Sequence, residues 1–188
     1  MLSKKLVIIK GSPRKRGNSC VLADSLAKGA KDNGAEIEEF FIQKMNIKPC
    51  NACDACITKP KKECIIDDDM QQIYPAIRTA NSVVISSPIY WFNMSAQTKL
   101  FIDRLYGLVE PNKQLMKDKR IGIILTYGDV DQVSSGAINA INSFKDTFKY
   151  IGAEITGIIH GSASAIGEIE KNTELMTKAY NLGKELSS

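Results

Sequence analysis

Short runs of aliphatic and β-branched residues alternate along the chain with longer segments in which apolar residues recur every three or four positions. The short runs predict five strands, namely Lys5 to Lys10, Glu36 to Phe41, Ser82 to Ser86, Arg120 to Thr126 and Glu154 to Ile159. Within them, Val83, Val84 and Ile85 are consecutive apolar residues, a pattern typical of strands that are buried on both faces. The alternation therefore predicts an α/β fold with a parallel sheet between two layers of helices.

The segments between the strands predict amphipathic helices. Apolar residues at helical spacing run from Leu22 to Ala30, from Ile138 to Ile151 and from Met176 to Leu186. Two further helices are expected from about Met70 to Ala80 and from Ser95 to Leu108, because aspartates and a serine stand where helices are usually capped. We expect each apolar stripe to pack in the core rather than to contact a ligand.

The composition is that of one ordinary globular domain spanning residues 1–188, with 44% hydrophobic and 24% charged residues. No apolar run approaches the roughly 20 residues of a membrane-spanning helix, and no secretory leader is recognisable, so we expect a cytoplasmic protein without a membrane partner. The net charge of +4 comes from scattered residues, which argues against a nucleic-acid partner. One local concentration of cations, around the first predicted turn, suits a small anionic ligand: Lys10, Arg14, Lys15 and Arg16.

The first chemical motif follows the first predicted strand directly, in Gly11-Ser12-Pro13-Arg14-Lys15-Arg16-Gly17-Asn18-Ser19. It leads into a predicted helix, whose N-terminus offers unpaired N–H groups and the positive end of the helix dipole to a phosphate. Ser12, Asn18 and Ser19 would add side-chain hydrogen bonds. The spacing of the glycines excludes a Walker loop and the dinucleotide fingerprint, which leaves a terminal monophosphate as the ligand. The simpler alternative is a strand-to-helix turn in which Asn18 or Ser19 is only a cap.

Two further loops stand at the ends of predicted strands. The segment Ser87 to Asn93 contains three consecutive aromatic residues, Tyr90, Trp91 and Phe92, and the segment Thr126 to Asp129 follows the fourth strand. In a doubly wound sheet, ligands bind at the carboxyl ends of the strands, where the strand order reverses. A flat isoalloxazine ring would find apolar walls and backbone donors there. For the aromatic loop, ordinary packing or a dimer contact is the alternative.

Four of the five cysteines lie in residues 46–66, a segment outside the alternation of predicted strands and helices. Their spacing is Cys50-x2-Cys53-x2-Cys56-x7-Cys64. Three thiols at x2 spacings, with a fourth from further along, favour a cuboidal iron–sulfur cluster of the 4Fe–4S type. Structural zinc more often pairs two C-x2-C units across a longer gap, so iron–sulfur outranks zinc. The long gap before the fourth cysteine leaves reduced or redox-active thiols near a flavin as the alternative. The fifth cysteine, Cys20, is expected to be buried in the first helix.

Three other features suggest structural roles. His160 is the only histidine, so no histidine-based catalytic triad or multi-histidine metal site can be built. The residues Asp67 to Asp69 precede a predicted helix, and we expect them to act as caps rather than as metal ligands. Asp103 and Arg104 are expected to form an internal ion pair or an interface contact.

In order and combination, the motifs between residues 11 and 104 resemble the family of NADPH-dependent FMN reductases and iron–sulfur flavoproteins. The resemblance is carried by Gly11 to Arg14, Gly17 to Ser19, the four clustered cysteines, Asp68 to Met70, Ser87 to Tyr90, and Lys99 with Phe101 to Arg104. It implies a flavodoxin-like three-layer sandwich with a five-stranded parallel sheet of order 2-1-3-4-5 and a Cys-rich insertion after strand 2. It also implies bound FMN and a homodimer or homotetramer.

The resemblance further implies which residues contact the cofactors. The phosphate would be held by Ser12, Arg14, Gly17, Asn18 and Ser19. The flavin ring would be lined by Pro88, Ile89, Tyr90, Trp91 and Phe92, and closed by Thr126, Tyr127, Gly128 and Asp129. Cys50, Cys53, Cys56 and Cys64 would hold the iron–sulfur cluster, although not every family member with such a run of cysteines contains one.

The function implied by the resemblance is that of an FMN-dependent oxidoreductase. A hydride from NAD(P)H would reach the flavin, and the electrons would leave to a small acceptor or to a redox carrier protein. No side chain is expected to be catalytic, because the flavin carries the chemistry. Two alternatives stay open: an iron–sulfur flavoprotein electron carrier without substantial NAD(P)H turnover, and a redox-sensing interaction protein of the flavodoxin fold.

Overall fold

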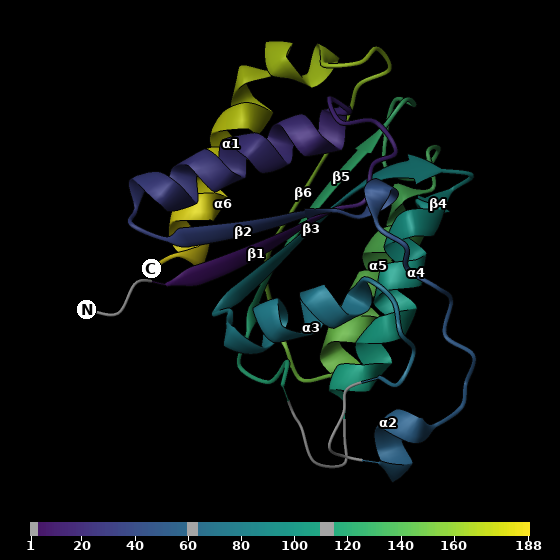
Figure 1. The fold of residues 1–188 in the computed structure, drawn as a ribbon. Helices are drawn as coiled ribbons and strands as arrows, with labels where there is room; N and C mark the ends of the chain where they lie inside the picture. Colours follow the sequence, from purple (N-terminus) through teal and green to yellow (C-terminus); the bar gives the residue numbers. More distant parts are fainter. Residues whose placement is uncertain (1–3, 60–63, 110–114) are drawn as a thin grey trace.

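The computed structural model describes residues 4–59, 64–109 and 115–188 (Figure 1). All five predicted strands are present and parallel: β1 (Lys5–Lys10), β2 (Glu36–Phe41), β3 (Ser82–Tyr90), β5 (Arg120–Tyr127) and β6 (Glu154–Ser162). Their order across the sheet is β2-β1-β3-β5-β6, which confirms the expected flavodoxin-like order. The order reverses between β1 and β3, so the carboxyl ends of these strands flank the crevice in which doubly wound sheets bind ligands.

Three strands continue past the ends that the sequence predicts. β5 extends to Tyr127 and β6 to Ser162 because their parallel ladder continues, whereas the end of β3, Ile89 and Tyr90, pairs antiparallel with residues 93 and 94. The last pair between β3 and β5 is Pro88 with Thr126, a position that suits a residue without a backbone N–H. Several residues predicted to contact a cofactor therefore lie on strand ends rather than in free loops.

A sixth strand, β4 (Asn93–Met94), pairs antiparallel with the end of β3 and was not expected from the sequence. Trp91 and Phe92 form the two-residue turn of this hairpin, with φ of 47° and 63°. Positive φ at both central residues is typical of a type I′ turn, which usually contains Gly or Asn. The hairpin was missed because neither aromatic residue is a common turn former.

Helices cover both faces of the sheet (Figure 1). On one face lie α1 (Asn18–Asp32) and α6 (Thr173–Leu186), and on the other lie α3 (Met70–Thr79), α4 (Ala96–Arg104) and α5 (Ala137–Tyr150). Short helical turns complete the fold: η1 (Ile42–Lys44), α2 (Ala55–Thr58), η2 (Leu105–Leu108) and η3 (Glu168–Lys171). The predicted helix from Ser95 to Leu108 is thus divided between α4 and η2. Within the described residues, no helix combines the length and the apolar character needed to cross a bilayer.

The helices α1 and α6 approach each other very closely at two glycines. A Cβ atom at Gly29 would collide with the carbonyl oxygen of Tyr180, and a Cβ atom at Gly183 would collide with the carbonyl oxygen of Leu26. Neither obstacle is a side chain that can rotate away. The close packing of this helical layer therefore requires glycine at both positions.

We expect Gly183→Ala to destabilise the fold by roughly 1 to 3 kcal/mol, the usual cost of overpacking. The higher helix propensity of alanine offsets at most about 1 kcal/mol of this cost. Urea unfolding followed by far-UV circular dichroism measures the change in the free energy of unfolding. The control is Asn181→Ala on the exposed side of the same helix, which should change that free energy by less than about 0.5 kcal/mol. Equal stability of Gly183→Ala and the wild type would contradict the close contact.

Candidate functional site

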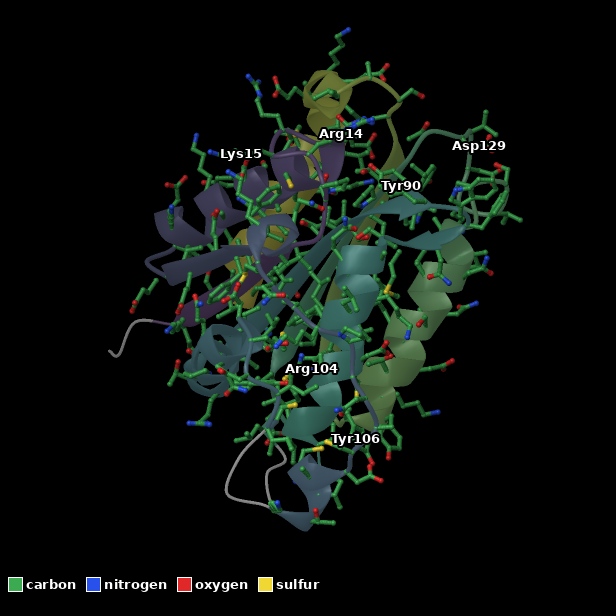
Figure 2. All side chains as sticks on the ribbon, turned by 45° about the vertical axis from the view of Figure 1, so that its right-hand side comes forward. Arg14, Lys15, Tyr90, Arg104, Tyr106 and Asp129 are labelled. Atoms are coloured by element: carbon green, nitrogen blue, oxygen red, sulfur yellow. The ribbon has the colours of Figure 1, made fainter. Side chains whose placement is uncertain are left out.

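A cavity of about 320 Å³ opens at the carboxyl edge of the sheet, between the loop before α1 and the ends of β3, β5 and β6. Its lining residues are Ser12, Arg14, Gly17, Asn18, Pro88, Ile89, Tyr90, Thr126, Tyr127, Gly128, Ala163, Ser164 and Ile166. All three sequence motifs predicted to contact a flavin therefore meet around one cavity. Figure 2 shows Arg14, Tyr90 and Asp129 at the same end of the molecule.

The first turn of α1 forms the polar end of this cavity. Gly17 is the N-cap and provides no side-chain hydrogen bond, and among the described residues the N–H groups of Asn18 and Ser19 have no acceptor. Ser12 Oγ accepts a 3.1 Å hydrogen bond from the Arg14 N–H, which closes the loop before the helix. A Cβ atom at Gly17 would collide with Ser12 Oγ, so a larger residue there would have to displace the Ser12 hydroxyl. This end of the cavity thus offers backbone donors and the helix dipole to an anion.

Only part of the predicted cation concentration faces the cavity. The Lys10 ammonium is held by two carboxylates at 2.6 Å, and Arg16 pairs with Glu170 at 3.4 Å. Arg14 lines the cavity, whereas the exposed Lys15 does not. Arg14 is therefore the cation of this group that is placed to meet an anionic ligand.

The loop after β6 forms a cavity wall that the sequence analysis missed. Asn18 Nδ2 donates to the carbonyl oxygens of Ala163 at 3.1 Å and Ala165 at 2.9 Å, so this side chain tethers the loop. Glu168 accepts from the N–H groups of Ala165 and Ser164, both at 2.8 Å, and these bonds hold the pKa of Glu168 below its ordinary value. The available signal was the run of small and hydroxyl residues after the fifth predicted strand.

Ser19, Trp91, Phe92 and Asp129 were predicted to contact the cofactor but do not line the cavity. Ser19 is fully buried in α1, and its hydroxyl has no partner in the described part of the chain. Trp91, at the hairpin tip, is 93% exposed, and the carbonyl oxygen of Phe92 accepts a hydrogen bond from Asn139 on α5. Asp129 Oδ1 accepts from the N–H of the next residue at 2.7 Å. The wall on this side is therefore formed by the strand residues 88–90.

Beside the cavity, the Tyr127 hydroxyl lies 3.0 Å from His160 Nδ1, which links the ends of β5 and β6. Burial raises the pKa of Tyr127 and lowers the pKa of His160, so the imidazole is neutral at neutral pH. The histidine thus has the structural role expected from the sequence.

The four clustered cysteines lie at the opposite end of the molecule. Cys50, Cys53, Cys56 and Cys64 line one small cavity of about 20 Å³ together with Arg104 and Tyr106, which Figure 2 shows far from Arg14 and Tyr90. Among the described residues, no three Cys, His, Asp or Glu side chains are arranged to hold a single metal ion. A cuboidal cluster takes its thiolates at four separate iron corners, which requires a wider arrangement around a common centre. Cys20, in contrast, is buried in α1 as predicted.

The backbone of the cysteine segment turns sharply and is anchored at its base. Ala52 and Asp54, on either side of Cys53, both have φ of 52°, a left-handed conformation that costs free energy for residues other than glycine. At the base, the Asn46 N–H donates to Asp69 Oδ2 at 2.6 Å. Residues 60–63 of the segment lie outside the described residues.

Arg104, on α4, contacts the chain on both sides of the cysteines. Its guanidinium donates to Asp68 at 2.5 and 3.2 Å, to the Lys48 carbonyl oxygen at 2.8 Å and to Cys64 Sγ at 3.4 Å. Arg104 is 1% exposed and the Asp68 side chain is 0% exposed, so the pair is buried. Burial by itself raises the pKa of Asp68, but hydrogen bonds from Arg104 and from backbone N–H groups outweigh burial and hold this pKa below its ordinary value.

Of the two roles expected for Asp103 and Arg104, the ion pair between them is contradicted by the structure. Asp103 pairs instead with Lys99, one helical turn earlier, at 2.6 Å. Consecutive residues on a helix point in different directions, whereas residues four apart share a face. Of the three aspartates predicted to cap the third helix, Asp68 accepts from the Met70 N–H at 3.0 Å, whereas the N-cap residue Asp69 makes no side-chain capping bond.

Two features define the class of this protein. They are a doubly wound parallel sheet and a cavity at its carboxyl edge that has backbone donors at one end and aromatic and apolar walls at the other. Together they define a flavodoxin-like α/β protein. The chain belongs to the NADPH-dependent FMN reductase family, whose model matches residues 4–166.

Known proteins similar to this chain include flavoproteins from archaea and bacteria. An iron–sulfur flavoprotein of Archaeoglobus fulgidus is 32% identical over 187 residues, which cover 97% of this chain and 79% of the relative. Bacillus subtilis YwqN, whose name describes an NAD(P)H-dependent FMN-containing oxidoreductase, is 28% identical over 185 residues, which cover 96% of this chain and 97% of the relative. The solved structure of an NAD(P)H:quinone oxidoreductase from Methanothermobacter marburgensis has a TM-score of 0.79 over 99% of this chain and 97% of that chain, at 16% identity. This last similarity concerns the fold alone.

Family membership confirms the class predicted from the motifs, an FMN-dependent NAD(P)H oxidoreductase. FMN as the cofactor and a nicotinamide nucleotide as the electron donor follow from the same membership.

We expect Asp68→Asn to destabilise the protein by roughly 3 kcal/mol near neutral pH, because the change leaves the buried Arg104 without its counter-charge. A carboxyl group whose pKa is lower in the folded state contributes stability above its unfolded pKa, near pH 4, and loses it as pH falls through the folded pKa. The difference in the free energy of unfolding between wild type and variant should therefore shrink below about pH 4.

Urea unfolding of both proteins across this pH range measures the difference. Asp67→Asn removes the exposed neighbouring carboxyl group and serves as the control, with little expected effect at any pH. A difference that does not change with pH would contradict the buried ion pair.

Proposed function

We propose that this chain holds FMN in the 320 Å³ cavity and acts there as an NAD(P)H-dependent oxidoreductase. One observation carries the proposal: three segments far apart in the sequence line a single cavity at the edge where doubly wound sheets bind ligands. The polar end at a helix N-terminus suits a phosphate, and the aromatic and apolar walls suit a flat ring. FMN has both parts.

The phosphate of FMN would bind at the first turn of α1. The N–H groups of Asn18 and Ser19 are donors, and Gly17 allows a phosphate to approach the backbone. Arg14 supplies the positive charge for a charge-assisted hydrogen bond. Ser12 accepts from the Arg14 N–H, which leaves its own O–H as a further donor.

The flavin ring would lie among the strand ends. One wall is Pro88, Ile89 and Tyr90, a second is Thr126, Tyr127 and Gly128, and the third is Ala163, Ser164 and Ile166. Asn18 connects the phosphate end to the third wall, because it belongs to the first turn of α1 and donates to the loop after β6. Bound FMN supplies the chemistry of accepting a hydride and releasing electrons singly or in pairs. The residues of the chain orient the ring and keep water from its buried side.

The nicotinamide and the electron acceptor would use the same open side of the cavity in turn. The sequence contains no dinucleotide-binding fingerprint that would mark a separate nucleotide site. A small acceptor, such as a quinone, a nitro compound or free flavin, fits this arrangement, and a redox carrier protein is the alternative acceptor.

A second function, electron relay through an iron–sulfur cluster, is favoured by the cysteine cavity. Cys50, Cys53, Cys56 and Cys64 line one cavity and would supply four thiolates, the donor set of a 4Fe–4S cluster. The cavity is small, so a cluster would need the thiols to move outward. A cluster of this kind transfers single electrons between the flavin and an external carrier.

We also propose a homodimer or homotetramer whose subunits meet near the flavin cavity. Exposed large apolar side chains stand at this edge, namely Tyr90, Trp91, Phe92, Val130, Val133 and Ile166. An exposed apolar patch of this kind usually marks a contact with another molecule. Analytical ultracentrifugation measures the oligomeric state directly.

We expect Arg14→Ala to raise the dissociation constant for FMN roughly 10- to 100-fold, because a hydrogen bond to a charged group contributes about 1.5 to 3 kcal/mol. Titration of the apoprotein with FMN, followed by the quenching of flavin fluorescence, measures the constant. Lys15→Ala removes an equal charge next in the chain, outside the cavity, and should leave affinity within about twofold. Equal losses in the two variants would sink the assignment of the phosphate to this turn.

Protein purified without oxygen should contain about one FMN per chain and, with the cluster present, about four irons and four sulfides. Visible absorption with iron and sulfide analysis measures these contents. Stirred assays of NAD(P)H oxidation with quinone, nitro and flavin acceptors then separate the three hypotheses. Turnover supports the enzyme hypothesis. Bound flavin and cluster without turnover support the electron-carrier hypothesis. A protein that binds neither chromophore, even after addition of FMN, would overturn the proposal.

A further inference from the structure

Arg104 brings a buried guanidinium group to the wall of the four-cysteine cavity. A guanidinium has five N–H donors in one plane. Nη1 donates to Lys48 O and Asp68 Oδ2, and Nη2 donates to Asp68 Oδ1 and Cys64 Sγ. The remaining donor, Nε–H, is buried and has no acceptor in the part of the chain that the structure describes.

The planar geometry of the group shows where this free donor points. Both oxygens of Asp68 occupy the edge between Nη1 and Nη2. The outer N–H of Nη2, which donates to Cys64 Sγ, lies parallel to Nε–H along the neighbouring edge. The free donor therefore points from the edge that also carries the bond to Cys64 Sγ, where the Tyr74 hydroxyl lies close to both side chains without accepting a hydrogen bond from Nε. A buried donor without an acceptor is costly unless a ligand supplies one.

Arg104 makes more hydrogen bonds than are needed to hold the cysteine segment in place. The bonds to the Lys48 carbonyl oxygen and to Asp68 already join the chain before the cysteines to the chain after them. Beyond these bonds, Nη2 reaches one cavity sulfur, Cys64 Sγ, and the buried Tyr74 hydroxyl lies close to both Arg104 and Cys64. Asp68 neutralises the far edge, so the positive side of the pair faces the thiols.

We propose that Arg104 positions Cys64 and donates its free N–H to a sulfur atom of the cluster, which raises the reduction potential of the cluster. This inference rests on the proposal that the four cysteines hold an iron–sulfur cluster. Reduction adds one electron and no proton, so the reduced cluster is more negative and gains more from a fixed positive charge and an N–H···S hydrogen bond. Arginine stays charged throughout the accessible pH range, so the effect does not depend on pH.

The test compares Arg104→Met and Arg104→Lys with the wild type in the full chain, purified without oxygen and carrying FMN and cluster. Redox titration followed by electron paramagnetic resonance measures the potential of the cluster. In Arg104→Met, which keeps an apolar stem but loses charge and donors, the ratio of reduced to oxidised cluster at a fixed potential should fall about tenfold, or about 59 mV. Arg104→Lys keeps the charge and loses the planar fork, so a smaller fall is expected.

Two controls separate this effect from general damage. Arg120→Met removes an equal charge at a residue that contacts Glu185 on α6, and it should leave the cluster potential unchanged. The FMN content and the flavin potential should also stay unchanged in all variants, because the flavin cavity lies at the other end of α4 from Arg104 (Figure 2).

The outcomes distinguish this inference from the proposal beneath it. Wild-type protein without iron and sulfide overturns the cluster assignment and the inference with it. A wild-type cluster whose potential is the same in both Arg104 variants overturns the inference alone. Loss of the cluster from both variants also overturns it, since Arg104 would then be only a structural requirement. If Arg104→Met alone loses the cluster, a lowered potential in Arg104→Lys supports the inference and an unchanged potential overturns it.

Discussion

The helix α4 is held by buried polar contacts at both ends, and both candidate sites depend on its position. At its N-terminus, the Ser95 hydroxyl donates to the Gly11 carbonyl oxygen at 2.7 Å and the Ser95 N–H donates to Ser87 Oγ at 3.0 Å. These bonds join the helix to the segments that follow β1 and end β3. A Cβ atom at Gly11 would collide with the Thr98 hydroxyl on α4, so the segment after β1 packs directly against this helix. At its C-terminus, Arg104 joins the helix to the cysteine segment. The carboxyl edge of the sheet and the thiol cavity are therefore both joined to the same helix.

Much of the fold and the cavity could be predicted because the decisive patterns are local. The run from Val83 to Ile85 is apolar on both faces, so it identifies an interior strand without knowledge of its partners. The three cofactor segments could be recognised because each follows a strand, and parallel strands end at one edge of the sheet. Topology then brought them together: Arg14, Tyr90 and Gly128 line one cavity although they are far apart in the sequence.

The features that could not be predicted depend on contacts between distant residues. Asp68 and Arg104 are 36 positions apart, so local spacing favoured the wrong partner, Asp103. Asn18 lines the cavity, but the bonds of its side chain to the loop after β6 span 145 and 147 positions, so its place at a helix start did not indicate them. The hairpin turn at Trp91 contains no residue typical of turns, and it is held by a hydrogen bond from α5. In each case a long-range contact outweighed a local tendency.

The exposed hairpin tip has a consequence for spectroscopy. Trp91 is the only tryptophan in the chain, it is 93% exposed, and it follows Tyr90, which lines the cavity proposed to hold FMN. The indole emission of the whole protein therefore comes from one water-exposed group at the rim of that cavity, with no background from the core. A flavin absorbs where indole emits, and a neighbouring subunit over the tip would shift the emission to shorter wavelength. Each chain thus carries a built-in optical reporter at the edge where cofactor, nucleotide and second subunit would meet.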